Sequence, residues 1–600
     1  MATNEAPADP SPEDPAGPTS RAGCAAVLAA VFAAMAWWSR GAWPDATVDF
    51  GRELYLTWRV AEGDLLYRDL PYFDGPLSLL LNGGLASLAG MSLRTLVAAN
   101  LLVAAALTVA LFALLERIAD RWAALAGCVL WLTTFAFARL LDVGNYNFAA
   151  PYTHLATHGT MLAAASLLCL DRVLRGSWRW GGALGLALGT AFLGKADFFA
   201  ATLGAVLAGA LAGVWAMPDS RAALRRAALA AAACAPLAPL LCVAWFAREL
   251  PLSEAVRAAL GSWPHLLGGA SGLPFYRGVL GVDQLGANLR LMAVASAGWC
   301  ALLAALLAAA RLVRVPAGRE GLAAAAAFIA PVALLSQARW PDAFRPLPLA
   351  VAALCVWSLW PLRASRGGAE APRAALRLAF LAWGALLLGK VALNAKLRHY
   401  GFALALPGSL ALCAFLVRWL PELLRRWPLP TAAARAAGLG VTASVVLAHL
   451  LVSGFWYGTL KTPVGEGADR FRAQASAAAI DEAVAWLERE RPGATLAAYP
   501  DGAMLNYLAR RRNPSGQTLA VPTALALIGE ENVVRALAAA PPDLVAVVHK
   551  DTSDEGARFF GADYALLLDG WIRENYRGVA LFGEPPHTGP GFGIVILERR

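Results

Sequence analysis

Charged residues are scarce in this chain. They make up 16% of its 600 residues, whereas 58% are hydrophobic and the mean hydropathy is +0.53. Soluble globular proteins carry about 25% charged residues, so this composition excludes an ordinary soluble domain. Apolar runs of roughly 17 to 25 residues recur along the chain, which is the length needed to cross about 30 Å of hydrocarbon. We therefore predict a polytopic α-helical membrane protein.

Lysine is also rare, because 46 of the 51 basic residues are arginine and only five are lysine. The formal net charge is +9, but the basic residues lie in short loops between apolar runs. That distribution is typical of residues that set membrane orientation, and it gives no reason to expect a nucleic-acid partner. The lipid bilayer is the expected surrounding of this chain.

Cysteine occurs eight times and always inside or near an apolar run. No cysteine follows Phe455 and the spacing C-x-x-C is absent, which excludes disulfides in the polar C-terminal region and a common zinc motif. We interpret the cysteines as small packing residues. We expect no metal site and no cofactor, although a required divalent cation stays possible. The eight positions are Cys24, Cys128, Cys169, Cys234, Cys242, Cys300, Cys355 and Cys413.

The apolar runs predict thirteen membrane spans, with ends uncertain by several residues. Residues 1–21 precede them and have the composition of a disordered tail. The run 76–91 is shorter and contains Gly83-Gly84, so we interpret it as an interfacial or re-entrant helix. The expected spans are 22–38, 94–115, 122–141, 154–170, 180–194, 198–216, 227–246, 288–310, 321–338, 346–362, 375–393, 401–417 and 436–455.

An odd number of spans places the two termini on opposite sides of the membrane. The six loops on the side of the N-terminus hold nineteen arginines, more than the loops of the other side. Arginine-rich loops face the cytoplasm, so we predict a cytoplasmic N-terminus and an extracytoplasmic C-terminal region in a bacterial inner membrane. The first span opposes this trend, because Arg40 lies outside and the tail is acidic.

The region 456–600 differs from the spans that precede it. The segments "ATLAAYP" and "DLVAVVH" are typical of short buried strands, and "AAIDEAVAWLERERPG" and "YALLLDGWIRENY" of helices. Such alternation predicts a small α/β domain. It contains no G-x-G-x-x-G and no P-loop, so nothing indicates a nucleotide site. The expected division is a transmembrane domain at 22–455, with its first outer loop at 39–93, and an extracytoplasmic domain at 456–600.

The first outer loop holds the densest group of carboxylates, five acids and three arginines between Val48 and Asp69. Asp49 and Glu53 are four residues apart and share one face of a helix, with Arg52 beside both. A partly desolvated carboxylate at the bilayer surface suits a general base that takes a proton from a hydroxyl or an amine. An amphipathic surface helix with paired charges is the alternative.

Other polar groups fall at the same outer ends of spans, where ionisable residues are costly and often functional. Lys195 ends a span in "FLGKADFF", where an ammonium suits a lipid-linked phosphate, or snorkels to lipid headgroups. The segment "NAKLRHY" is either a phosphate cradle or an interfacial anchor. We select the following residues of these segments as candidates for binding donor or acceptor: Arg52, Asp69, Asn145, Tyr146, His154, His158, Lys195, Lys396, Arg398, His399 and Tyr400.

His154 and His158 stand one helical turn apart in "NYNFAAPYTHLATHG". A zinc site needs a third ligand and usually a nearby glutamate, as in H-E-x-x-H, and the motif is absent. We prefer hydrogen bonding to substrate or to neighbouring loops for both side chains.

At these residues the chain resembles a known group of enzymes. "DFGRELYLTWRVAEGDLLYRDLPYFDGPLSLLLNGGLASLAG" is similar to the first outer loop of bacterial glycosyltransferases of the GT-C superfamily. The most similar kind is glycosyltransferase family 39, which is related to protein mannosyltransferases and lipid A aminoarabinose transferases. The resemblance continues through "NYNFAAPYTHLATHG", "FLGKADFF", "FYRGVLGVDQLGANL", "RPLPL", "NAKLRHYGFALALPG", "PDGAMLNYLARRRNPSG" and "PPDLVAVVHKDTSDEG".

The resemblance implies a transfer reaction at the outer face of the membrane. Such enzymes move a sugar from a polyprenyl-phosphate donor to a lipid, glycan or protein acceptor. An acid of the first outer loop acts as base, which implies Asp49, and a lysine that ends a middle span contacts the donor phosphate, which implies Lys195. Many relatives carry adjacent Asp-Glu, whereas here Phe50 follows Asp49 and the next acid is Glu53. Glu53 is therefore a second catalytic candidate.

Three alternatives stay open. A lipid-linked glycan ligase would use similar groups at the same face. A transporter or flippase would be expected to show paired broken helices in two halves, and no internal repeat is evident. A membrane scaffold would leave the gathering of Asp49, Lys195 and His399 at one face unexplained.

Overall fold

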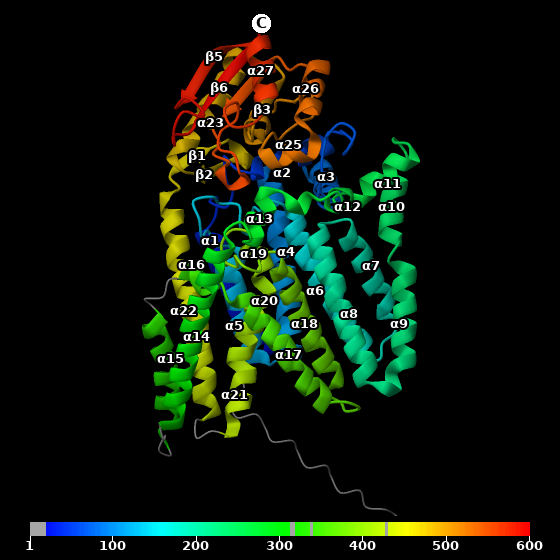
Figure 1. Cartoon of the computed structure of the whole chain (residues 1–600), viewed down its shortest axis with the longest axis vertical. Coiled ribbons are helices and arrows are strands. Elements are labelled where there is room, and N and C mark those ends of the chain that lie inside the picture. Colours follow the sequence, from blue (N-terminus) through cyan, green and yellow to red (C-terminus); the bar gives the residue numbers. More distant parts are fainter. Residues whose placement is uncertain (1–19, 313–317, 336–339, 427–429) are drawn as a thin grey trace, which may run out of the picture.

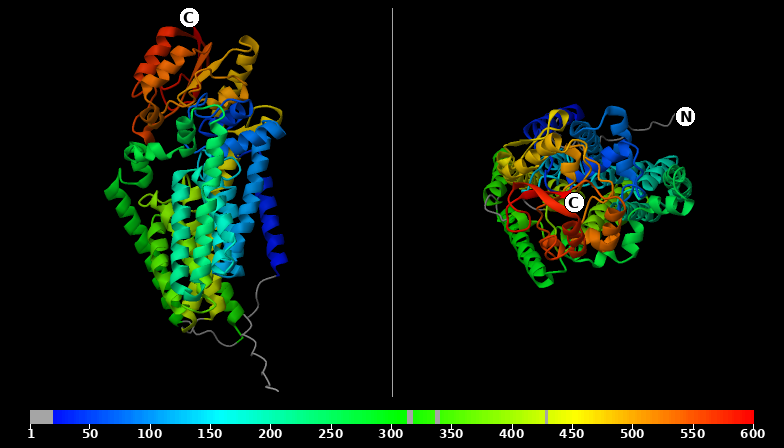
Figure 2. Two further views of the ribbon diagram at one scale, coloured as in Figure 1. Left: turned by 90° about the vertical axis from the view of Figure 1, so that its right-hand side faces the viewer. Right: turned by 90° about the horizontal axis from the view of Figure 1, so that it is seen from above.

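The computed structural model describes residues 20–312, 318–335, 340–426 and 430–600. A tall body of helices carries a smaller sheet domain at one end (Figure 1). Of the predicted disordered tail, residues 1–21, positions 1–19 lie outside the described residues, whereas Arg21 is the first residue of α1. Two further views show that the sheet domain, with the C-terminus, lies over the ends of the helices, whereas α1 begins at the opposite end (Figure 2).

The helical body confirms the predicted class of polytopic α-helical membrane protein. Within the described residues, nine helical stretches are long and apolar enough to cross a membrane, and each contains one of the thirteen predicted spans or most of it. Three more predicted spans fall on shorter apolar helices, and the last on the 21-residue helix α6. Positions 336–338 of one predicted span lie outside the described residues. Many large apolar side chains around this body are exposed, which suits contact with lipid.

The helical body is made of the following helices, given in chain order. They are α1 Arg21–Trp38, α4 Leu93–Ile118, α5 Arg121–Trp131, η1 Leu132–Ala136, α6 His154–Leu174, α7 Trp180–Phe192, α8 Ala196–Ala216, η2 Pro218–Ser220, α9 Arg221–Cys234, α10 Leu237–Phe246, α14 Leu285–Leu312, α15 Glu320–Leu335, α17 Leu347–Ala364, α18 Ala371–Gly389, α20 Leu406–Ala414, η4 Phe415–Trp419, α21 Leu420–Leu423, η5 Leu424–Arg426 and α22 Thr431–Thr459.

Short helices form a layer between the helical body and the sheet domain. The helix α3 corresponds to the predicted interfacial run and continues through its two glycines. Gly83 packs against Val60 of α2, where a larger side chain would collide. The layer contains α2 Phe50–Ala61, α3 Leu77–Ala89, α11 Leu252–Leu260, α12 Trp263–Leu267, η3 Ala270–Gly272, α13 Pro274–Leu280 and α19 Gly401–Leu404. The short helix α16 Trp340–Ala343 instead packs against α14 and α22 within the helical body.

The C-terminal domain has the predicted α/β character. Its four-stranded sheet has the order β3-β4-β6-β5, in which β3 and β4 are parallel and the other pairs antiparallel. The predicted strands and helices correspond to β3, β4, α23 and α27. The elements are β1 Thr462–Val464, η6 Gly467–Asp469, β2 Phe471–Ala473, η7 Ala475–Ala477, α23 Ala478–Glu490, β3 Leu496–Tyr499, α24 Ala503–Leu508, α25 Pro522–Ile528, α26 Glu530–Ala539, β4 Leu544–Val548, η8 Ser553–Glu555, α27 Leu566–Asn575, β5 Tyr576–Gly583 and β6 Gly593–Arg599.

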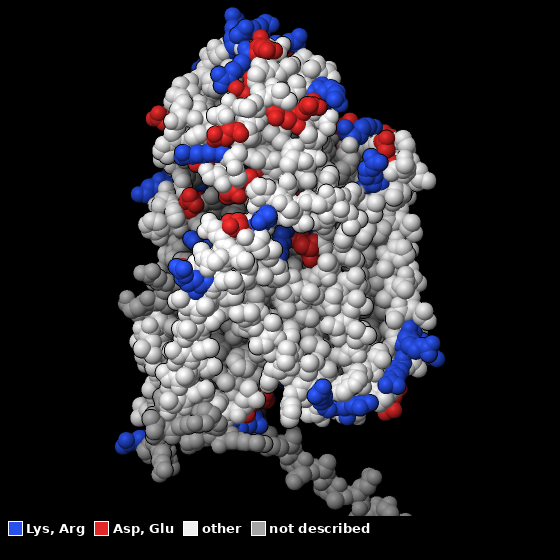
Figure 3. Space-filling model, viewed as in Figure 1, with Lys and Arg blue, Asp and Glu red and all other residues white. Residues whose placement is uncertain are grey.

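Charged side chains are sparse along the middle of the helical body and frequent at its two ends (Figure 3). Lysines and arginines gather at the end away from the sheet domain, over the turn between α8 and α9, where Arg221, Arg225 and Arg226 are exposed. Acidic and basic groups both occur where the sheet domain meets the helices. The candidate residues of the first loop lie in this junction.

Candidate functional site

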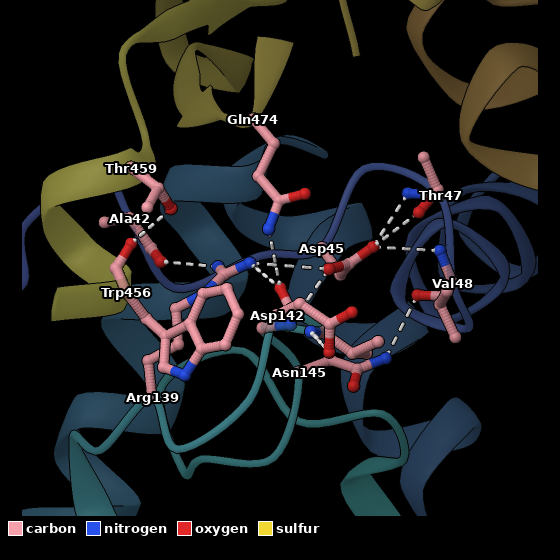
Figure 4. A network of polar contacts seen from close by, with 12 residues as sticks. Ala42, Asp45, Thr47, Val48, Arg139, Asp142, Asn145, Trp456, Thr459 and Gln474 are labelled. Carbon is pink, nitrogen blue, oxygen red and sulfur yellow. Dashed lines mark hydrogen bonds and ion pairs between the residues drawn. The ribbon is translucent and has the colours of Figure 1, made fainter. Parts of the chain in front are cut away.

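Asp45 shapes the backbone that leads to Asp49 (Figure 4). One oxygen of its carboxylate accepts the backbone N–H of Val48 over 3.1 Å, and the other accepts that of Gly144 over 2.9 Å. The amide of Asn145 donates to the carbonyl oxygen of Val48 over 3.0 Å. Two of these contacts hold Val48, the residue before Asp49, and the third ties Asp45 to the loop between η1 and α6. Asn145, a predicted substrate-binding residue, has here a positioning contact.

Asp49 stands directly before α2 with a backbone φ of +51°, a conformation that non-glycine residues rarely adopt. Its backbone N–H donates to Oδ2 of Asp501 over 3.3 Å, and Nζ of Lys550 lies 2.5 Å from the same oxygen. Burial raises the pKa of Asp49 to about 6; the charge of Lys550 lowers it, that of Asp501 raises it and that of Arg52 lowers it. A small pocket between the first loop and the C-terminal domain is lined in part by Asp49 and Asp501.

The side chain of Arg52, in the first turn of α2, is buried. Its guanidinium lies over the ring of Phe73 at 5.4 Å and over that of Tyr72 at 6.0 Å. Among the described residues its Nε has no hydrogen-bond partner. A buried guanidinium with an unused donor is suited to bind an anionic or hydroxyl-rich ligand.

Glu53 makes a buried contact with α6. Its Oε2 accepts the Nδ1–H of His154 over 2.6 Å and the backbone N–H of the same residue over 3.2 Å. Burial works against the charge of Glu53, but these hydrogen bonds and the charge of Arg52 outweigh it and lower the pKa of Glu53. One turn along α6, Nδ1 of His158 is hydrogen-bonded to Oγ of Ser78 at 2.9 Å.

Lys195 and the first loop meet through two glycines. A Cβ on Gly75 would lie 2.1 Å from the carbonyl oxygen of Gly194, so only glycine allows this approach. The backbone N–H of Leu77 also donates to the carbonyl oxygen of Leu193 over 3.1 Å. The motifs "FDGPL" and "FLGKADFF" therefore fit against each other, which brings the charge of Asp74 close to Lys195.

The ammonium of Lys195 lies 3.3 Å from the hydroxyl of Tyr152 and 5.2 Å from the centre of its ring. Burial lowers the pKa of Lys195, but Tyr152, Asp74 and Asp197 outweigh burial and raise it, so the side chain is cationic. Two residues on, Asp197 forms an ion pair with Lys390 at 2.5 Å. Lys195, directly before α8, and Lys390, directly after α18, therefore both lie near Asp197 in the junction.

Aromatic rings connect Lys195 to the loop before α19. Tyr152, which Lys195 contacts, packs against Tyr400 with ring centres 5.1 Å apart. Tyr146 packs on His399 at 4.4 Å and on Tyr400 at 5.7 Å. The three predicted residues Tyr146, His399 and Tyr400 are therefore together in one cluster.

Lys396 lies among other cations in the same loop. Burial, followed by the charges of Arg345 and Arg398, lowers the pKa of Lys396. Burial, and the charges of Lys396 and Arg398, lower the pKa of His399 to about 4. Arg345 is itself buried, with Nη1 donating to Asn288 Oδ1 over 2.7 Å. A group of cations that repel one another in this way is suited to bind an anion such as a phosphate.

Asp69, a predicted substrate-binding residue, lies in the junction but makes contacts that support the backbone. Its carboxylate accepts the backbone N–H of Leu65 over 2.8 Å and pairs with Arg68 at 2.9 Å. Its carbonyl oxygen lies against Gly516 of the C-terminal domain, where a Cβ would come within 2.2 Å. Asp69 therefore shapes a turn and seats the domain.

Several charged residues of the junction were not predicted from the sequence, among them Asp45, Lys390, Asp501 and Lys550. Asp501 and Lys550 follow β3 and β4, two strands whose buried residues were recognised. Polar residues directly after adjacent parallel strands meet at one edge of a sheet, which is the signal that could have identified them. No group of three or more His, Cys, Asp or Glu in the described parts of the chain could hold a metal ion.

The whole chain was compared with known proteins. No family model matches it, and no curated protein matches it either. Among solved structures, the chain is similar to the oligosaccharyltransferase AglB of Archaeoglobus fulgidus in complex with an inhibitory peptide and a dolichol-phosphate. That match has 13% identity and a TM-score of 0.49, and covers 95% of this chain and 74% of the other.

The chain is also similar to ArnT of Cupriavidus metallidurans bound to undecaprenyl phosphate. Here the identity is 14% and the TM-score 0.41, with 96% of this chain and 98% of the other covered. Both neighbours are members of the GT-C superfamily, the group that the sequence resembles.

Proposed function

We propose that this protein is a membrane glycosyltransferase that moves a sugar from a polyprenyl-phosphate donor to a lipid, glycan or protein acceptor. Asp49 carries the proposal, because it is a carboxylate in a strained backbone with a pKa of about 6, at one end of the helical body and next to the cations Arg52 and Lys550. A general base works best when its pKa lies near the operating pH.

The reaction follows from these groups. A hydroxyl or amine of the acceptor attacks the anomeric carbon of the donor sugar, and its proton passes to the carboxylate of Asp49. The bond between the anomeric carbon and the phosphate oxygen breaks, and polyprenyl phosphate leaves with the electron pair. A single displacement of this kind inverts the anomeric centre.

Cationic side chains would stabilise the leaving phosphate. Lys195 is cationic and contacts Tyr152. The positive charges of Lys396 and Arg398 repel each other, and a bound anion would offset this repulsion. Preorganised charges at the place where negative charge develops are the largest usual contribution to such catalysis. His399 lies beside this group, and we assign all four to the donor phosphate.

The sugar and the acceptor would contact the remaining candidates. Tyr146 and Tyr400 present aromatic rings near Asp49, whose charge acts on both hydroxyls. Arg52 has an unused donor in the same surface. We assign these three to substrate binding, and His154 and His158, which bond to Glu53 and Ser78, to the support of the site.

The site would face the extracytoplasmic side of a bacterial inner membrane, with the N-terminus in the cytoplasm. This orientation is supported by the arginines that gather at the end of the helical body away from the sheet domain (Figure 3). The donor lipid would then remain in the bilayer while its phosphate reaches the junction.

The test is transfer from a panel of radiolabelled polyprenyl-phosphate sugars in membranes that contain wild-type or Asp49→Asn protein. Label is expected to reach an acceptor only with wild type. The matched control is Asp142→Asn, which changes an exposed acid of a neighbouring loop and should transfer like wild type.

Equal transfer by folded Asp49→Asn protein would overturn the role of the base. Absence of transfer from every monosaccharide donor would instead favour two other classes. Transfer of a whole lipid-linked glycan would identify a ligase, and movement of the intact donor across vesicle membranes would identify a transporter or flippase.

A further inference from the structure

The C-terminal domain brings two oppositely charged residues to the N-terminus of α2. Asp501 lies two residues after β3 and Lys550 two residues after β4, and these neighbouring strands are parallel. Their carboxyl ends therefore meet at one edge of the sheet. Nζ of Lys550 lies 2.5 Å from Oδ2 of Asp501, and both side chains are largely buried.

This pair reaches Asp49 directly. Oδ2 of Asp501, the oxygen that binds Lys550, also accepts the backbone N–H of Asp49 over 3.3 Å. The contact holds a residue whose φ of +51° is unfavourable without support. Asp45 of the first loop and Asn145 of the loop before α6 hold the preceding residue, and Asp501 adds a contact from the C-terminal domain.

The charged groups that face Asp49 come from four segments. Arg52 belongs to α2, Asp501 and Lys550 to the ends of β3 and β4, and Glu555 to η8. The two cations favour the ionised carboxylate of Asp49, and the two acids oppose it. Three of the four charges around Asp49 therefore belong to the C-terminal domain.

Other contacts seat the domain independently of this pair. The backbone N–H of Asn513 donates to the hydroxyl of Tyr55 over 2.9 Å, and that of Leu93 donates to Asp469 over 2.6 Å. Gly51 lies against the backbone of Met504 so closely that a Cβ would come within 2.4 Å. Loss of the charges at 501 or 550 should therefore leave the domain in place.

We propose that Asp501 and Lys550 are positioning residues for Asp49, and that the C-terminal domain completes the active site by holding this carboxylate in place. The inference rests on the proposed function, because it assigns a task to the base of that reaction. Neither residue needs to touch the substrate for this task.

The first experiment records kcat against pH for wild type, Asp501→Asn and Lys550→Met. Lys550→Met removes a cation that lies near Asp49, so the acidic limb of the profile of kcat against pH should move to higher pH. Asp501→Asn keeps an oxygen that accepts the N–H of Asp49 but removes a negative charge, so the limb should move to lower pH. Each shift should be at least about half a pH unit. Limbs that stay in place, or move in the same direction, would overturn the proposal.

Matched variants separate this effect from a general loss of structure. Asp543→Asn changes an acid at the other end of the same strands, where it binds Thr495, and Lys461→Met changes an exposed lysine after α22. Both should keep the wild-type limb. Lys550→Arg should restore most of the limb position that Lys550→Met loses, since it returns the charge, whereas failure to restore it would count against a charge effect.

The second experiment does not depend on activity. Hydrogen exchange of the peptide that covers residues 47–52 should be at least about tenfold faster in Asp501→Ala than in wild type, while the segment 505–513 keeps its protection. Unchanged exchange at 47–52 would overturn the positioning role. If no donor is turned over by wild type, the proposed function fails, yet the exchange result still decides whether Asp501 holds Asp49.

Discussion

Glu53 and His154 form a buried pair that joins the first loop to α6. The Nδ1–H of His154 donates to Oε2 of Glu53 over 2.6 Å, and on the other side of the ring Asn100 Nδ2 donates to Nε2 over 3.1 Å. His154 is the first residue of α6, so the carboxylate also lies at the positive end of a helix. This geometry favours a structural task for Glu53, whereas its catalytic role stays a prediction.

Replacement of Glu53 by alanine should destabilise the protein more than it changes the chemistry. The change leaves His154 buried without its partner, and breaking such a pair costs about 3 kcal/mol. We expect a lower midpoint of thermal unfolding in detergent, with the acidic limb of the pH profile of any remaining activity close to its wild-type position. The exposed Glu62→Ala is the control. Wild-type stability together with lost transfer would return Glu53 to catalysis.

The transfer rate should depend on the ionisation of Asp49. Its pKa is raised by burial to about 6, and only the ionised carboxylate can accept a proton. The rate is therefore expected to be highest above pH 6 and to fall about tenfold per unit below it. Initial rates between about pH 4.5 and 8 check this. A profile without any break near pH 6 would contradict the assignment.

Lys195→Ala should weaken binding of the donor. The ammonium is held over Tyr152 and suits a lipid-linked phosphate as a point charge, so its loss should raise the KM for the donor about tenfold or more, with a smaller change in KM for the acceptor. Lys461→Ala, an exposed lysine elsewhere, is the comparison. An unchanged donor KM would indicate a lysine that contacts only lipid headgroups.

Gly51→Ala should loosen the C-terminal domain. A Cβ there would lie 2.4 Å from the backbone nitrogen of Met504, which cannot move without shifting α24. We expect a loss of about 2 kcal/mol and faster proteolysis in the junction. Gly84→Ala is the matched control, because a Cβ at this helical glycine meets nothing within 4 Å. Equal protease resistance of both variants would show that the junction tolerates the shift.

Removal of divalent cations should leave the transfer rate unchanged. In the proposed reaction the phosphate is stabilised by Lys195, Lys396 and Arg398. Rates in the presence of EDTA, and after return of Mg²⁺ or Mn²⁺, test this expectation. Loss of activity that a cation restores would show that a metal ion takes part.

Most of the candidate site could be located from sequence but not assembled from it. The expectation that acids, lysines and aromatic residues lie at one end of the spans places Asp49, Lys195, Tyr146 and His399 in the junction, since a helix end is a local property. Their partners could not be derived in the same way. Asp69 and Asn145 lie in the same junction, yet their hydrogen bonds support the backbone, because nearby N–H and C=O groups compete for such side chains.

By itself, the sequence determined the class of the protein, the order of its apolar helices and the α/β character of its C-terminal region. These properties depend on hydrophobicity and periodicity within short segments, which one chain displays directly. Only the tertiary structure decided that Asp501 and Lys550 reach Asp49, and that Glu53 turns to His154. Such contacts join residues from about 100 to 500 positions apart, and they follow from backbone approaches such as Gly51 on Met504 that no local pattern encodes.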